Sequence, residues 1–188
     1  SFPSDWVRLI GKGNGGLRTY GLWLHPNGSL LWQMYGHSSV NLWSNTKLST
    51  GAWYHLAATR SGNTVTIYVN GVADASTTYS GTPHSNTSWL TIGSAVTMHD
   101  YLPGKLDEVA VWNKARTQAE IQASMSNILS GTEVGLVAYY KMNDGSGTSL
   151  TDSSSNSNTG TLINMTDADW VDGNANFNDN SGLFNISN

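Results

Sequence analysis

Four side chains with the chemistry to hold a sugar lie in one short region of the sequence: Trp23, His25, Gln33 and Tyr35. An aromatic ring stacks on the apolar face of a pyranose, while amide and imidazole groups bond to hydroxyls. A shallow site of this kind needs only a few well-placed polar groups. The four residues can act together only if they share a surface. Alternate side chains of a β-strand point to the same face, so a hairpin would bring them together.

The turn between the two halves of this region predicts such a hairpin. Residues 19–25 and 29–35 flank a Pro-Asn-Gly sequence at 26–28. Proline presets φ at the first turn position and glycine accepts a positive φ at the last, as in a three-residue hairpin loop. This loop places His25 opposite Ser29, and the four candidate residues then lie on one face. We expect Trp23 and Tyr35 to be partly exposed there.

The other face of the predicted hairpin is entirely apolar or aromatic. It carries Tyr20, Leu22, Leu24, Leu30, Trp32 and Met34. We therefore assign it to the core, although a register slip of one residue would exchange the two faces. An alternative remains for the candidate sugar face, which could itself be covered by a loop or a second sheet. Trp43, Trp89 and Tyr101, in or near predicted loops, are reserve candidates.

A second candidate site is a loop rich in oxygen ligands. Asp152, Asn156 and Asn158 offer three of the six to eight oxygens that Ca²⁺ prefers. Residues 142–188 contain six aspartates and no basic residue, which favours a bound cation. The alternative is a set of Asx turns in which Asp152 accepts hydrogen bonds from backbone N–H groups. Both readings stay open at this point.

Composition excludes several classes of protein. The 188 residues include nine Lys and Arg against thirteen Asp and Glu, a net charge of −4. No basic stripe is present, so we expect no nucleic-acid partner. No apolar run approaches the roughly 18 residues of a membrane-spanning helix, so we expect no membrane insertion. Cysteine is absent, which removes disulfides and thiol chemistry.

The rest of the chain reads as short strands with one helix. A second hairpin is predicted over 53–71, and alternating Val, Ile, Thr and aromatic residues predict the remaining strands. These are expected at 72–79, 88–94, 105–113, 135–142 and 159–165. Thr117 and Glu120 form a capping-box pattern that begins a helix closed by Gly131. The predicted fold is therefore all-β, with two packed antiparallel sheets.

Several segments between residues 50 and 165 carry recognisable motifs. The most specific are a G-L-V-A-Y-Y strand with its D-G turn and a D-S-S-S-N-S-N-T-G loop. The segments are 51–57, 65–71, 104–115, 135–145 and 152–160. In this order they resemble the laminin G-like, concanavalin A-like jelly-roll family. The resemblance implies a jelly-roll β-sandwich forming a single domain over 1–188, within a larger or tandem-repeat protein.

The resemblance has two further implications. In many such jelly rolls the strand that begins at the position of Asp107 supports a structural calcium, so Asp107 joins Asp152, Asn156 and Asn158 as a candidate ligand. Family members usually open with a strand that is missing here, and residues 177–186 look like it instead. The chain could be a fragment of an array, be permuted, or complete a neighbouring copy through this tail.

The resemblance does not imply catalysis. Glycoside hydrolases of this fold need two or three acidic residues at alternate positions of a strand. Asp107 and Glu108 are adjacent, so they point to opposite faces, and Glu133 is isolated. Lyases of this fold need a basic cluster that no strand carries. We therefore expect a protein that is not an enzyme.

The sequence thus predicts a secreted or cell-surface, lectin-like module that binds carbohydrate and is stabilised by calcium. Its expected partners are polysaccharides or cell-surface glycans, together with other copies or neighbouring domains of the parent protein. The alternative is a structural or adhesive module that self-assembles through strand pairing.

Overall fold

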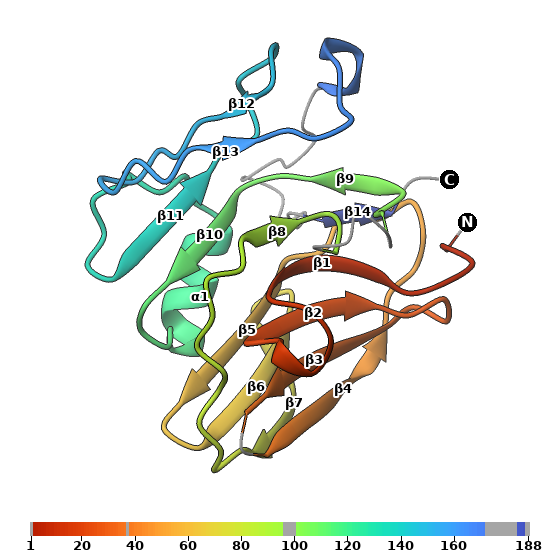
Figure 1. Ribbon diagram of the computed structural model, residues 1–188, viewed down its shortest axis with the longest axis vertical. Coiled ribbons are helices and arrows are strands. Elements are labelled where there is room, and N and C mark those ends of the chain that lie inside the picture. Colours follow the sequence, from red (N-terminus) through yellow and green to blue (C-terminus); the bar gives the residue numbers. More distant parts are fainter. Residues whose placement is uncertain (1, 37, 96–100, 172–183, 187–188) are drawn as a thin grey trace.

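The computed structural model describes residues 2–36, 38–95, 101–171 and 184–186 (Figure 1). Every strand pairing within these ranges is antiparallel. The largest sheet has five strands in the order β4-β3-β2-β1-β8. Its members are β1 (Val7–Lys12), β2 (Tyr20–Leu24), β3 (Ser29–Tyr35), β4 (Ser39–Lys47) and β8 (Leu90–Ile92). A 3-10 turn, η1 (Gly15–Leu17), joins β1 to β2.

A three-stranded sheet packs against one face of the larger sheet. It consists of β5 (Leu56–Ser61), β6 (Thr64–Val69) and β7 (Val72–Thr78), and the two sheets overlap in the lower half of Figure 1. Val65 and Ile67 of β6 are fully buried and share one core cluster with the inner face of β1–β4. This arrangement confirms the predicted β-sandwich.

The remaining strands form pairs in the upper half of Figure 1. The pairs are β9 (Gly104–Leu106) with β14 (Phe184–Ile186), β10 (Val109–Trp112) with β11 (Leu136–Tyr140), and β12 (Ser149–Leu150) with β13 (Gly160–Thr161). The strand predicted over 159–165 is thus only two residues long. A 3-10 turn, η2 (Asp167–Asp169), follows β13.

The predicted register of the first hairpin is confirmed. Gly21 pairs with Gln33, Leu22 with Trp32, and the pairing continues to the turn. At the turn, the Gly28 N–H donates to the His25 carbonyl at 2.9 Å. The predicted core face lies in the main core cluster, with Leu24 and Leu30 fully buried. The hydrophobic pattern and the turn therefore agree on the same register.

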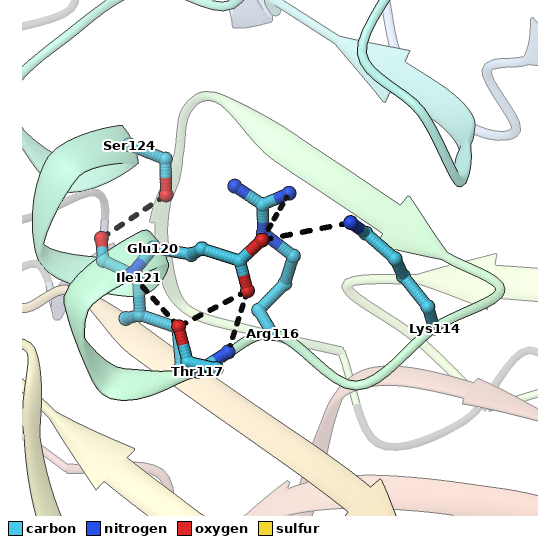
Figure 2. Close-up of polar contacts among 6 residues, drawn as sticks. All are labelled: Lys114, Arg116, Thr117, Glu120, Ile121 and Ser124. Atoms are coloured by element: carbon cyan, nitrogen blue, oxygen red, sulfur yellow. Dashed lines mark hydrogen bonds and ion pairs between the residues drawn. The ribbon is translucent and has the colours of Figure 1, made fainter.

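The predicted helix cap is also present, as Figure 2 shows. Helix α1 (Gln118–Met125) begins at Thr117, whose side chain accepts from the Glu120 N–H while the Glu120 carboxylate accepts from the Thr117 N–H. The helix stops at Ser126, earlier than the glycine predicted to close it. Within the described residues, no helix is long and apolar enough to cross a membrane.

The strand predicted over 105–113 is broken. Glu108 has a φ of 53°, in the left-handed region, and separates β9 from β10. Its carboxylate accepts a hydrogen bond from the Tyr139 hydroxyl on β11. The sequence pattern predicts an unbroken strand because the neighbouring residues favour strands, while the hydrogen bond at the break joins residues 31 positions apart.

The predicted strand in the tail lies partly outside the described residues. Within them, β14 covers Phe184–Ile186 and pairs with β9 of the same chain, Phe184 opposite Leu106 and Ile186 opposite Gly104. These three residues therefore return to the chain's own fold.

His55 gives the fold a pH-dependent stability. The side chain is buried, and its backbone exchanges hydrogen bonds with Asn70 across the β5–β6 pair. Burial lowers the pKa of His55 from 6.5 to about 4. The folded value lies below the unfolded one, so the unfolded chain binds the proton more readily, and stability is lost as the pH falls from about 6.5 towards 4.

We expect urea unfolding to show this loss. Between pH 7.5 and 4.5 the free energy of unfolding of the wild type should fall by about 2 kcal/mol more than that of His55→Gln, which cannot take up the proton. The comparison uses the slopes of stability against pH, so a constant cost of the substitution cancels. Equal slopes for the two proteins would contradict the conclusion that His55 causes the pH dependence.

Candidate functional site

The outer face of the five-stranded sheet, away from the core, holds the predicted sugar-binding residues. Trp23 pairs with Leu31, which pairs with Trp43, and Gly21 pairs with Gln33, which pairs with Asn41. These pairs form two rows across β2, β3 and β4. The predicted group of Trp23, His25, Gln33 and Tyr35 is thus brought to one face, and β4 adds two residues to it.

Trp23 is buried, which corrects the expectation that it is partly exposed. Only 7% of the residue is accessible, and it packs with Leu31 and Ala95. The guanidinium carbons of Arg8 and Arg18 lie 4.5 and 4.7 Å from its ring centroid. The long arginine side chains cover apolar surface with their stems and the indole face with their charge. Trp23 therefore supports the surface and does not offer its ring to a ligand.

An exposed aromatic cluster lies beside it, made of Trp6, His25 and Trp43. The ring centroids are 4.7 Å apart for Trp6 and His25, 5.4 Å for Trp6 and Trp43, and 5.7 Å for His25 and Trp43. Trp43 is 44% exposed. Both tryptophans pack edge to face with His25, the two tryptophans are tilted against each other, and the rings hold one another in place. The cluster is a preformed platform with one large exposed ring.

A hydrogen bond of the turn orients the His25 ring within this cluster. The Asn27 backbone N–H donates to its Nδ1 at 3.2 Å. Because Nδ1 acts as an acceptor, the proton of the neutral imidazole lies on Nε2. The ring therefore has a defined donor on its other side.

A polar row borders the platform. Gln33 Nε2 donates to Asn41 Oδ1 at 2.8 Å and to the Tyr35 hydroxyl at 3.3 Å, and Arg18 donates to Gln33 Oε1. The Arg18 guanidinium also lies over the Tyr35 ring, 5.2 Å from its centroid. These contacts fix the Gln33 amide and place amide and hydroxyl groups at the surface. The row meets the aromatic cluster at a hollow of about 300 Å³ lined by Trp6, Arg18, Trp23, Leu31, Gln33 and Tyr35.

The sequence placed Trp43 in a loop, although it belongs to β4. The signal that could have found this strand is alternation, because Val40 and Leu42 are buried while Asn41 and Trp43 are exposed. The reserve candidates Trp89 and Tyr101 are 74% and 52% exposed, and neither takes part in this aromatic cluster.

The oxygen-rich loop binds itself together. Asp152 is buried, and its two carboxylate oxygens accept from the backbone N–H groups of Tyr139, Ser154 and Asn158 and from the Ser154 hydroxyl, at 2.7–2.9 Å. Burial alone would raise the pKa of Asp152, but these four hydrogen bonds outweigh it and lower the pKa. The structure thus adopts the Asx-turn alternative.

The two asparagines of the loop also make hydrogen bonds within the chain, with their side chains as donors. Asn156 Nδ2 donates to the carbonyls of Leu136 and Val137, and Asn158 Nδ2 donates to that of Val137 at 2.8 Å. The two amide nitrogens therefore tie the loop to β11. Asp152, Asn156 and Asn158 thus hold the loop together by hydrogen bonds, and a Ca²⁺ ion bound by these residues stays a prediction.

Asp107 lies apart from this arrangement, directly before the break at Glu108. Burial raises the pKa of the Asp107 carboxyl, partly offset by a hydrogen bond from the Glu108 backbone. Within the described ranges, no three His, Asp or Glu side chains gather in a way that could hold a metal. A calcium ion at Asp107 stays a prediction from the family resemblance.

Comparisons with known proteins agree with this fold. A sequence profile described as the concanavalin A-like lectin/glucanases superfamily matches residues 1–122. The crystal structure of a proposed carbohydrate-binding protein from Bacteroides ovatus superposes with a TM-score of 0.66 at 24% identity, over 86% of this chain and 50% of that one. The chain thus spans half the length of that protein. Comparison with the curated proteins finds no match.

A second solved structure is more distant. An S-layer domain-containing protein from Clostridium thermocellum superposes with a TM-score of 0.36 at 21% identity, over 64% of this chain and 63% of that one.

Removing the Asp152 carboxylate should destabilise the fold whether or not calcium is present. Asp152→Ala leaves three backbone N–H groups without an acceptor, and we expect the free energy of unfolding to fall by at least about 3 kcal/mol. Asp144→Ala is the matched control, since among the described residues its carboxylate accepts only from the Thr151 N–H, at 3.3 Å. Chemical denaturation in EDTA and in millimolar Ca²⁺ measures the free energy of unfolding of both variants. A loss confined to the calcium arm would contradict the hydrogen-bonding role.

Proposed function

The chain belongs to the concanavalin A-like lectin/glucanases superfamily, and on that premise we propose that it is a non-catalytic module that binds carbohydrate. The matched region, residues 1–122, contains the whole outer face of the five-stranded sheet. The proposal places the binding site on that face, at the aromatic cluster and the polar row beside it.

One observation carries the proposal, which is that Trp43 and a row of oriented polar groups lie on the same sheet face. Trp43 presents a large exposed ring, held at its base by Trp6 and His25. Gln33 and Asn41 lie in the next row of the same sheet face. A pyranose stacked on Trp43 would present its hydroxyls at the edge of the ring, where amide and imidazole donors and acceptors stand ready.

The similarity to the Bacteroides ovatus protein supports this proposal. That structure shares the fold and is itself a proposed carbohydrate-binding protein. The ligand class thus agrees with the chemistry of the Trp43 face.

The non-catalytic part of the proposal rests on the acidic residues. None of the described residues that line the hollow beside Trp43 is acidic. Glu108, one of the acidic residues considered for catalysis, accepts from the Tyr139 hydroxyl on another part of the fold. Glycoside hydrolysis by the usual route needs two carboxyl groups facing one glycosidic bond.

The proposed setting is outside the cell. A non-catalytic module of this kind would attach a secreted or cell-surface protein to a polysaccharide or a cell-surface glycan. Calcium at Asp107 belongs to the same proposal as a stabilising ion.

Substituting Trp43 tests the site directly. Trp43→Ala should weaken retention on a polysaccharide by about 1–3 kcal/mol, by analogy with the stacking of bases on aromatic side chains. A glycan array with the wild type, run with and without EDTA, first selects the polysaccharide and shows whether retention needs a metal. Affinity electrophoresis then measures how strongly that polysaccharide retains the Trp43→Ala variant.

Trp89→Ala is the matched control, because Trp89 is even more exposed but lies outside the aromatic cluster. It should bind like the wild type. Equal retention of the wild type and both variants would reject the site on this face, and circular dichroism would verify that each variant is folded.

A further inference from the structure

Two strand edges border an apolar slot on a different part of the fold. The slot is a cavity of about 400 Å³ lined by residues 54–60, by residues 106–116, and by residues of α1 and the segment that follows it. Its floor comes from the inner face of the five-stranded sheet and includes Leu22, Trp32 and Met34. The segments 54–60 and 106–116 correspond to β5 and β10.

Neither bordering strand has a partner on the slot side in the described part of the chain. There, β5 is an edge of the sheet β5-β6-β7, and β10 pairs with β11 alone. The slot therefore lies between two open strand edges.

The hydrogen-bond pattern shows which backbone groups face the slot. The His55 carbonyl accepts from Asn70 next to β6, and backbone groups of alternate residues point to opposite sides of a strand. Leu56, Ala58 and Arg60 therefore direct their N–H and C=O groups away from β6. On β10, the Asn113 N–H donates to Gly135 beyond β11, so Ala110 directs its backbone groups away from β11. The two edges offer two rows of donors and acceptors.

The side chains of β5 that face the core are more exposed than the corresponding side chains of β6. In β6, the inward-facing Val65 and Ile67 are fully buried. On the neighbouring strand β5, Leu56 and Ala58 pack against the same core but stay partly exposed. An additional strand with apolar side chains at alternate positions would cover them, since alternate residues of a strand share one face.

The two ends of the slot carry opposite charges. β5 and β10 both point to the lower left in Figure 1, so they run roughly in the same direction in this view. Arg60, the last residue but one of β5, lies at that end, and Lys114 and Arg116 follow β10. Lys114 and Arg116 form ion pairs with the same carboxylate, that of Glu120, at 3.5 and 3.4 Å (Figure 2). Asp107 and Glu108 lie at the start of β10, at the opposite end.

We propose that the slot accepts one extended strand of a partner polypeptide, inserted between β5 and β10 and antiparallel to both. Addition of a strand to open edges is an established mode of peptide recognition, in which backbone hydrogen bonds supply affinity and pockets for alternate side chains supply selectivity. The partner strand should carry apolar residues at alternate positions, an acidic residue near its start and a basic residue near its end.

The chain's own tail is a less suitable occupant. β14 already places residues 184–186 against β9.

A synthetic peptide tests the proposal on the full chain. The probe is a fluorescein-labelled Asp-Val-Thr-Val-Thr-Val-Thr-Lys peptide, compared with one in which Asp and Lys are exchanged and one in which the three valines are adjacent. We expect the first to bind most tightly in fluorescence anisotropy. When this peptide is bound, the slot-facing amides of β5 and β10 should exchange their hydrogens more slowly. The exchange rates of the β4 amides should not change.

Proline variants separate strand addition from general stickiness. Ala58→Pro removes an N–H that faces the slot and makes no bond to β6, as proline does on natural edge strands. It should weaken binding by at least about tenfold, through loss of a hydrogen bond and obstruction of the edge. Ala58→Ser keeps the N–H and should bind like the wild type. Ala110→Pro and Ala110→Ser repeat the comparison on the facing strand.

Each other outcome overturns the proposal. Absence of protection at millimolar peptide would do so, as would equal binding by the proline and serine variants. If the β5 and β10 amides are already protected and deletion of residues 172–188 exposes them, the tail is the occupant. If their protection rises with protein concentration in step with dimer formation, a second copy is the occupant.

Discussion

The turn at residues 26–28 is the constraint on which both faces of the large sheet depend. Gly28 has a φ of 86°, and a Cβ there would lie 2.5 Å from the Leu48 carbonyl oxygen, so no other residue fits without displacing the backbone. The turn sets the register of β2 and β3, and a shift by one residue would send Trp32 outward and Gln33 into the core. The core and the proposed binding face are therefore two consequences of one pairing.

The hairpin could be predicted from the sequence because its determinants are local. The turn residues and the alternation of side chains lie within residues 19–35, and both indicate the same register. What covers the outer face could not be predicted in this way. Arg8 lies opposite Trp23 only because β1 pairs with β2, and its guanidinium reaches the indole from there. Alternation tells which side a residue faces and does not tell what lies on that side.

The distance in sequence between interacting residues also bears on the other predictions. The capping box of α1 joins residues three apart, and the sequence predicts it correctly. The break at Glu108 involves a hydrogen bond to Tyr139, 31 positions away. The strand β4 was missed although its signal, the alternation of buried and exposed residues, is local. Asp152 shows a third situation, in which the same oxygens suit a cation or a set of N–H donors. The loop closes on itself because those donors lie close in sequence or on the adjacent strand.

The two proposed sites share one hairpin yet use opposite faces of it. Leu22 and Trp32 form the slot floor, while Gln33, the neighbour of Trp32 in sequence, belongs to the polar row outside. A substitution in the floor would therefore disturb both sites through the core. The residues that we single out, Trp43 for carbohydrate and Ala58 for a partner strand, lie on different sheets. Effects at sites without shared partners are generally additive, so a module built in this way could hold a glycan and a polypeptide strand at the same time.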